Sequence, residues 1–332
     1  MNRFRMPLRF ALVGLLAAFS AADLFAVRRT EDPLALVPAN AATVGVIRWN
    51  ELRNSPLGPR IFAALDEVST DGDAARFLRE TGLTPREDID TIVVAMSPGA
   101  RTGEPEDGLV IFEGRFDVDK LATALAGRGA SRRTSDAGDA YYRLANHGGE
   151  EGAVALVNRG LIVAGSERSV LAALARKENG GAGGLTSGAG LGRSLGRIDS
   201  QASAWALVDM SKFPSMKRDD AGGSDASGEP SRAIVGAMKS VSLIALQATV
   251  RGDAIELAAT GVTGDSENRD LLEDSLRGVL AMWRLAVQEK SPELVSVIRR
   301  FRIDNDGDAV SIRGTLPASF LSSLGSSHRA AK

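Results

Sequence analysis

The chain has 332 residues, a formal net charge of −2 and 5% aromatic residues, a balance that excludes the strongly basic class typical of nucleic-acid-binding proteins. The absence of cysteine excludes disulfides, thiolate catalysis, cysteine-ligated zinc and a lipidated cysteine. With 44% apolar residues the chain can bury the core of one large domain or of two ordinary ones.

Residues 1–26 have the pattern of an export signal. Arginines near the start are followed by the apolar, small residues 11–22, and cleavage before Asp23 is expected. The alternative is an uncleaved anchor over residues 10–27, which is short for a bilayer crossing. The sequence therefore predicts an extracytoplasmic chain, periplasmic or secreted, that contacts a membrane only if the signal is retained.

Residues 34–178 form the first predicted half, in which strands alternate with helices. Its clearest unit spans residues 108–126, where an apolar strand breaks at Gly114 and Asp117 stands as the N-cap of an amphipathic helix. Residues 34–40 are predicted as a non-helical lead-in and residues 85–88 as a turn. Further strands are expected at residues 43–49, 89–96, 141–144, 153–158 and 161–164, and further helices at residues 54–68, 73–81 and 166–174.

A glycine-rich stretch, residues 179–200, predicts a linker or mobile loop between the halves. Residues 201–325 form the second half, which contains a predicted disordered insertion at residues 217–231 and is followed by a polar tail at residues 326–332. Strands are expected at residues 204–208, 241–250, 255–260, 301–304 and 309–314, and helices at residues 268–290 and from Ser291 onward.

The order of elements in the second half follows that of the first, with residues 301–304 corresponding to residues 141–144. The sequence therefore predicts an α+β fold of two similar halves. Each half is expected to be an antiparallel or mixed sheet with helices packed on one face.

Three segments resemble a family of uncharacterised, secreted bacterial α+β proteins. They are FLRETGLTPREDI at residues 77–89, GLVIFEGRFD at residues 108–117 and VAGSERSV at residues 163–170. The resemblance extends over residues 36–174 and is loose beyond them. It implies an exported α+β protein and carries no activity, cofactor or site residue.

The two histidines and one acidic loop were considered as metal sites. His147 lies in a predicted turn and His328 in the polar tail, and with no third ligand nearby both are interpreted as loop histidines. Residues 304–308, DNDGD, resemble the start of a calcium loop, but Gly307 is at the fourth position instead of the sixth. An Asp-Gly hairpin between two strands is the preferred interpretation.

Motifs for phosphate binding and for serine catalysis are incomplete or do not follow a predicted strand. Residues 188–196 are glycine-rich but lack the Gly-Lys-Ser/Thr ending of a phosphate loop and do not follow a strand. Ser-x-x-Lys does not occur, and Gly-x-Ser-x-Gly occurs only within this glycine-rich stretch, at residues 192–196, which likewise follow no strand; Ser166 and Ser266 are interpreted as helix starts. The Arg-Gly-Asp tripeptide at residues 251–253 is interpreted as a turn.

Carboxylates are the remaining candidates for catalysis, because Glu67, Asp88, Asp90 and Glu113 lie near predicted strands. Spacing does not show that any two of them share a cleft, so the sequence predicts no catalytic residue, no cofactor and no metal ligand. We expect an exported, non-enzymatic binding or structural protein of the cell envelope with an envelope or extracellular partner. The alternative is a carboxylate-dependent hydrolase acting on an envelope polymer, so the question of enzymatic activity stays open.

Overall fold

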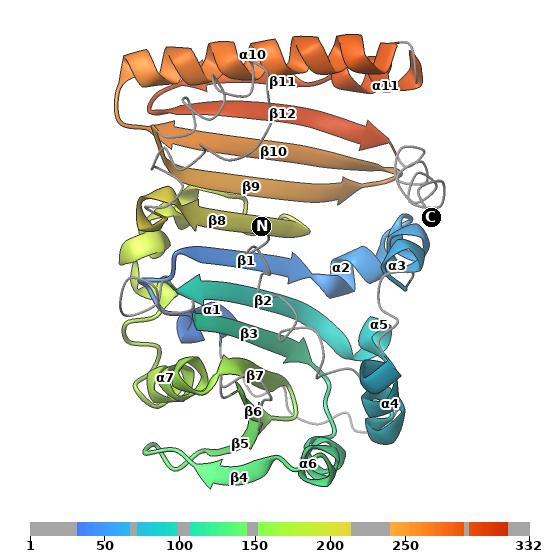
Figure 1. Ribbon diagram of the computed structural model, residues 1–332, viewed down its shortest axis with the longest axis vertical. Coiled ribbons are helices and arrows are strands. Elements are labelled where there is room, and N and C mark those ends of the chain that lie inside the picture. The colour runs from blue at the N-terminus through green and yellow to red at the C-terminus, as the bar shows by residue number, and fades with distance from the viewer. Residues whose placement is uncertain are drawn as a thin grey trace, which may run out of the picture. The chain divides into compact units, whose positions relative to one another are not determined.

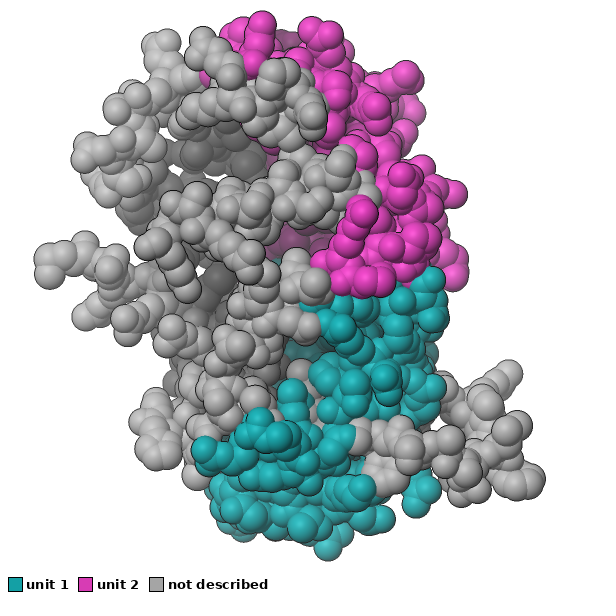
Figure 2. Space-filling model, turned by 90° about the vertical axis from the view of Figure 1, so that its right-hand side faces the viewer, with its two compact units in different colours: residues 1–54, 62–193 teal, residues 55–61, 194–332 magenta. Residues whose placement is uncertain are grey.

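The computed structural model describes residues 32–66, 72–97, 107–144, 152–213, 240–288 and 292–317. The chain divides into two compact units, coloured separately in Figure 2: unit 1 comprises Met1–Asn54 and Phe62–Arg193, and unit 2 comprises Ser55–Ile61 and Ser194–Lys332. The predicted signal, insertion and polar tail lie outside the described residues.

Unit 1 contains an antiparallel sheet, as Figure 1 shows. Its strand order is β1 (Thr43–Arg48), β2 (Ile89–Ser97), β3 (Asp107–Gly114), β7 (Leu161–Ser166), β6 (Gly152–Asn158), β5 (Ala140–Leu144) and β4 (Ser131–Thr134). Its helices are α1 (Pro33–Leu36), α2 (Trp49–Asn54), α4 (Gly72–Thr81), α5 (Pro85–Asp88), α6 (Val118–Gly127) and α7 (Glu167–Glu178), and α3 (Gly58–Asp66) contains the boundary between the units. The α+β class with an antiparallel sheet is confirmed.

The predicted strand-to-helix unit is present as β3 followed by α6. Asp117 is the N-cap of α6, since its side chain accepts hydrogen bonds at 3.0 Å from the backbone N–H groups of Asp119 and Lys120. Leu121 and Leu125 are the buried residues of the helix. Likewise, Ser166 caps α7 by accepting from the N–H of Ser169, so both residues have the cap role that the sequence predicts.

Both faces of the sheet are covered in unit 1, whereas the prediction placed helices on one face only. Four consecutive residues of β3, Leu109 to Phe112, are buried, and so are Leu161 to Val163 of β7. Because successive side chains of a strand point to opposite faces, an uninterrupted apolar run requires cover on both. Val110 and Phe112 pack with α6 and with Phe77 of α4, and α7 packs on β3, β6 and β7.

The segment predicted as a linker, residues 179–200, is instead ordered and contacts residues 35–39. It contains the 3-10 turns η2 (Leu185–Ser187) and η3 (Gly190–Arg197), and Leu185 is fully buried. The N–H of Leu185 donates to the carbonyl of Val37 at 2.8 Å. Here the glycines permit close backbone approach, since a Cβ on Gly184 would overlap the carbonyl oxygen of Ala35.

Two short segments predicted as non-helical are also helical. In α1, Pro33 occupies the first turn and Asp32 accepts from the N–H of Leu34, so the helix ends before Pro38 can interrupt it. In α5, Pro85 again stands in the first turn, and Asp88 closes the helix by accepting from Thr84. Four residues suffice for one such turn, which is too short for a periodic pattern to reveal.

The strands of unit 2 are also antiparallel, in the order β8 (Ala204–Asp209), β9 (Val241–Arg251), β10 (Ala254–Thr263), β12 (Ala309–Pro317) and β11 (Arg302–Asp306). Its helices are α10 (Ser266–Gln288) and α11 (Pro292–Ile298), with the 3-10 turn η4 (Met210–Lys212) after β8. Leu272 of α10 packs with Val241, Val310 and Met210 in the core. The start of α10 is capped by Asp265, whose carboxylate accepts from the N–H of Asn268 at 2.8 Å.

Two motifs of this unit are turns, as predicted. Gly252 lies between β9 and β10 with φ 60°, and Gly307 lies between β11 and β12 with φ 62°. Each glycine supplies the left-handed conformation of a tight hairpin. The Arg-Gly-Asp tripeptide therefore contains a hairpin turn, and the acidic segment 304–308 comprises the end of β11 and a hairpin turn at Gly307.

One ion pair of unit 2 leads to a prediction about acid stability. Arg197 donates to the carboxylate of Asp308 from both terminal guanidinium nitrogens, at 3.0 and 2.5 Å. The hydrogen bond from Arg197 lowers the pKa of Asp308 below its usual value near 4. A carboxyl with a lowered pKa in the folded state stabilises the fold above its unfolded pKa, and this contribution is lost as the pH falls through the folded value.

We therefore expect Asp308→Asn to be less stable than the parent at pH 7 by at most about 1 kcal/mol, because both side chains are partly exposed. The difference should vanish as the pH falls below about 4. Urea unfolding from pH 3 to 7 measures it, with Asp306→Asn as a control that makes the same charge change in the same hairpin. A difference that does not depend on pH would contradict the assignment.

Candidate functional site

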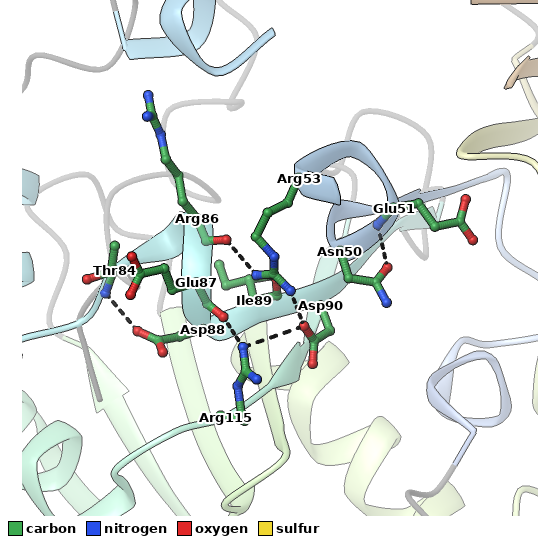
Figure 3. A network of polar contacts seen from close by, with 10 residues as sticks. All are labelled: Asn50, Glu51, Arg53, Thr84, Arg86, Glu87, Asp88, Ile89, Asp90 and Arg115. Atoms are coloured by element: carbon green, nitrogen blue, oxygen red, sulfur yellow. Dashed lines mark hydrogen bonds and ion pairs between the residues drawn. The ribbon is translucent and has the colours of Figure 1, made fainter. Parts of the chain in front are cut away.

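Two of the candidate carboxylates, Asp88 and Asp90, lie in one polar network of unit 1 (Figure 3). The network joins the end of α2, the α5–β2 junction and the residue after β3. The register between β2 and β3 shifts between Ile89 and Thr91, so Asp90 is the extra residue of a β-bulge. A bulge redirects the side chain of its extra residue, which here lies toward the arginines.

Arg53 is the centre of this network. Its guanidinium donates to the carbonyls of Arg86 at 2.5 Å and Ile89 at 3.2 Å, and to Oδ1 of Asp90 at 2.7 Å. Arg115 approaches the same Oδ1 atom at 3.9 Å and donates to the carbonyl of Glu87. Asp90 is thus held between two guanidinium groups, and Arg53 connects α2 to the α5–β2 junction.

Asp88 is held by the backbone instead. Its side chain is buried, with 2% of the residue exposed, and Oδ2 accepts from the N–H of Thr84 at 2.8 Å. Its carbonyl accepts from the N–H of Arg115 at 2.8 Å. A buried carboxylate that closes a helical turn is a structural element.

The other candidates are not brought into this network. Glu113 lies on β3 opposite Thr91 and Leu161. Glu67, His147 and His328 lie outside the described residues. Within the described ranges, no group of three or more His, Cys, Asp or Glu side chains is arranged to hold a metal ion.

A polar groove that the sequence did not reveal lies in unit 2, between α10 and the β11–β12 hairpin. It measures about 810 Å³. Its lining carries charges of both signs and comprises Glu273, Arg277, Ile303, Asp304, Asn305, Asp306, Ser311 and Arg313. These residues come from a helix and a hairpin that are distant in sequence, so no local spacing indicates them.

Asn305 organises this groove by bridging the hairpin to α10. Its side-chain amide donates to Asp270 at 3.0 Å and to Glu273 at 2.8 Å, and its oxygen accepts from Arg269 at 3.2 Å. Arg277 pairs with Glu273. The lining therefore offers both hydrogen-bond donors and acceptors, which suits a polar ligand better than an apolar one.

A second groove, of about 780 Å³, lies on unit 1 between α4 and α6. There Arg128 pairs with Glu80 at 2.9 Å and covers the ring of Phe77 at 4.9 Å from its centroid. This arginine secures the contact between the two helices, so we assign the groove a structural role. Among the described helices, none is long and apolar enough to cross a membrane.

The fold and these sites define an α+β protein with an open antiparallel sheet, and comparison with solved structures shows a likeness of fold. No family model and no curated protein matches the chain. The fold is similar to that of TP0453, a Treponema protein of unknown function, with a TM-score of 0.51 and 11% identity over 90% of this chain and 100% of TP0453. A second crystal form of TP0453 gives 0.47 at 11% identity, over 90% and 98% of the two chains.

At 11% identity this likeness shows the fold alone. It is consistent with the expected resemblance to uncharacterised bacterial α+β proteins. It assigns no site residue.

Proposed function

We propose that the chain is an exported, non-enzymatic binding or structural protein of the cell envelope. The proposal of export is supported by the signal pattern of residues 1–26. The absence of enzymatic activity is proposed because both candidate carboxylates have structural partners in the network of Figure 3. Asp88 accepts from a backbone N–H group, and Asp90 accepts from Arg53. The groove beside α10 is the place where we expect a polar ligand.

A carboxylate-dependent hydrolase remains the second candidate, because Glu273, Asp304 and Asp306 line the same groove. The two functions are separated by an assay of the full chain against isolated envelope polymers, with bound and released material measured together. We expect binding without release of fragments, and binding weakened by Glu273→Gln. Glu256→Gln is the matched control, since Glu256 lies on β10 and pairs with Arg251 outside the groove.

Release of fragments by the parent and by Glu256→Gln, but not by Glu273→Gln, would establish the hydrolase and overturn the proposal. Export is tested separately by mass spectrometry of the chain recovered from fractionated cells. An extracytoplasmic chain that starts near Asp23 supports export and cleavage, whereas one that keeps residues 10–27 supports the anchor. An unprocessed chain confined to the cytoplasm contradicts export.

A further inference from the structure

Helix α10 has two apolar faces, of which only one is buried. Leu272 and Leu280 are each 6% exposed and face the sheet of unit 2, as Leu272 shows by packing on Val241 and Val310. By contrast, Leu271, Met282 and Leu285 are 49%, 40% and 68% exposed. Exposed large apolar residues gathered on one face indicate an interaction surface.

The exposed residues share one stripe along the helix. Leu271, Gly278 and Leu285 are spaced at seven-residue intervals, and Met282 is four residues beyond Gly278. Residues at these intervals lie on the same side of an α-helix. A Cβ on Gly278 would meet no atom within 4 Å, so the middle of this stripe is open.

The stripe is symmetric about its centre. Leu271 and Leu285 are equally far from Gly278 along the helix. Ser275, three residues before Gly278, also has a small side chain. If a second α10 crosses this one in the antiparallel direction beside Gly278, Leu271 of each copy meets Met282 and Leu285 of the other. This is the condition for an isologous contact, in which the same patch serves both partners.

We propose that this stripe is the docking surface for a second copy of the chain, with the two α10 helices antiparallel and crossing at Gly278. In this arrangement Asp274 lies opposite Met282 of the second copy, so the two Asp274 carboxylates do not face one another. Glycine and serine at the crossing let the two backbones approach closely.

The charge of α10 favours a second copy over a membrane surface. The helix carries four acids and three arginines, and Glu267 and Asp274 border the stripe. A helix that binds an anionic bilayer carries a basic polar face instead. One helix pair about 35 Å long buries less than the roughly 1,200 Å² of a standard interface, so the dimer is weak and forms at high concentration.

Sedimentation equilibrium of the full chain from about 1 µM to 1 mM tests the association. We expect a concentration-dependent dimer that Leu285→Glu abolishes. Leu246→Glu is the matched control, because Leu246 is an exposed leucine, at 43%, that lies on β9. A parent protein that stays monomeric throughout this range overturns the proposal. A dimer that persists in Leu285→Glu also overturns it, provided that thermal unfolding shows that this variant is folded.

The absence of native cysteine allows the geometry to be tested by disulfide cross-linking. At the crossing point, Gly278→Cys should give covalent dimers on oxidation. Leu271→Cys alone should not, because in the antiparallel pair its two copies lie about 20 Å apart, beyond the reach of a disulfide. A mixture of Leu271→Cys and Leu285→Cys should cross-link as a heterodimer. Self-cross-linking of Leu271→Cys overturns the antiparallel arrangement.

A lipid surface is the alternative partner of this stripe. Co-sedimentation with vesicles of phosphatidylglycerol and phosphatidylethanolamine tests this alternative. We expect the same co-sedimentation for the parent and Leu285→Glu. Co-sedimentation that Leu285→Glu abolishes, together with a monomeric parent in solution, would assign the stripe to a membrane and overturn the dimer.

Discussion

Gly114→Ala is expected to lower the free energy of unfolding by about 3 kcal/mol, the upper end of the usual cost of overpacking. A Cβ at this position would overlap the carbonyl oxygen of Asp88 and lie 3.0 Å from Cα of Ile89. These are backbone atoms, which cannot rotate away as the end of a side chain can. Their positions are also fixed, because Asp88 holds both Thr84 and Arg115 by hydrogen bonds.

Gly108→Ala is the matched control, since Gly108 lies at the other end of β3 and a Cβ there would meet no atom within 4 Å. We expect this variant to equal the parent or to gain up to about 0.5–1 kcal/mol, because glycine in a strand is less favourable than alanine. Urea unfolding followed by circular dichroism compares the three proteins. Equal losses in both variants would show that close approach at Gly114 is not the cause.

Local patterns of the sequence predicted most of the individual elements. Asp117 and Ser166 were identified as caps because their backbone partners lie two or three residues away, within the same stretch of sequence. The strands β2 and β3 can be predicted because each contains a continuous run of apolar, β-forming residues. β4 was missed since its four residues, SRRT, are all exposed and carry no apolar pattern.

Packing between distant segments could not be predicted in the same way. Residues 179–200 have a linker composition, and only the three-dimensional contacts of Leu185 and Leu191 show why the segment is ordered. In each unit the last strand pairs with the third: β7 pairs with β3 in unit 1, and β12 pairs with β10 in unit 2. The next-to-last strand, β6 or β11, pairs with the other edge of the last strand. This shared order supports, as a proposal, the duplication predicted from element order.

Under the proposed duplication, the strand order also changes one correspondence between the halves. The sequence matches residues 301–304 to residues 141–144, which lie in β5. However, β11 pairs with the last strand of unit 2 as β6 does with the last strand of unit 1. Under the proposed duplication the counterpart of β11 is therefore β6, because strand pairing, which local sequence does not show, distinguishes β6 from β5.

For the candidate site, the sequence identified acids but not their partners. Asp90 was a candidate because it follows a predicted strand start, whereas Arg53 lies 37 residues earlier. No spacing rule connects residues so far apart, and the bulge that turns Asp90 toward Arg53 arises from the pairing of β2 with β3. Asp90, which the sequence indicates as a candidate catalytic group, therefore has a structural role.

Arg53→Ala should consequently destabilise unit 1 by about 2–3 kcal/mol, because it leaves Asp90 and two carbonyl oxygens without their donor. Arg53 is largely buried, with 22% of its side chain exposed. Arg115→Ala is the matched control, since 64% of that side chain is exposed and its approach to Asp90 is 3.9 Å. We expect it to cost less than about 1 kcal/mol.

Urea unfolding of Arg53→Ala, Asp90→Asn and the double variant then separates the ion pair from the two carbonyl contacts. Because Arg53 also binds the carbonyls of Arg86 and Ile89, Arg53→Ala should cost more than Asp90→Asn. The double variant should lose less than the sum of the single losses by about 1 kcal/mol or more, as for residues in direct contact. Strict additivity, or equal losses in Arg53→Ala and Arg115→Ala, would show that Arg53 does not secure this junction.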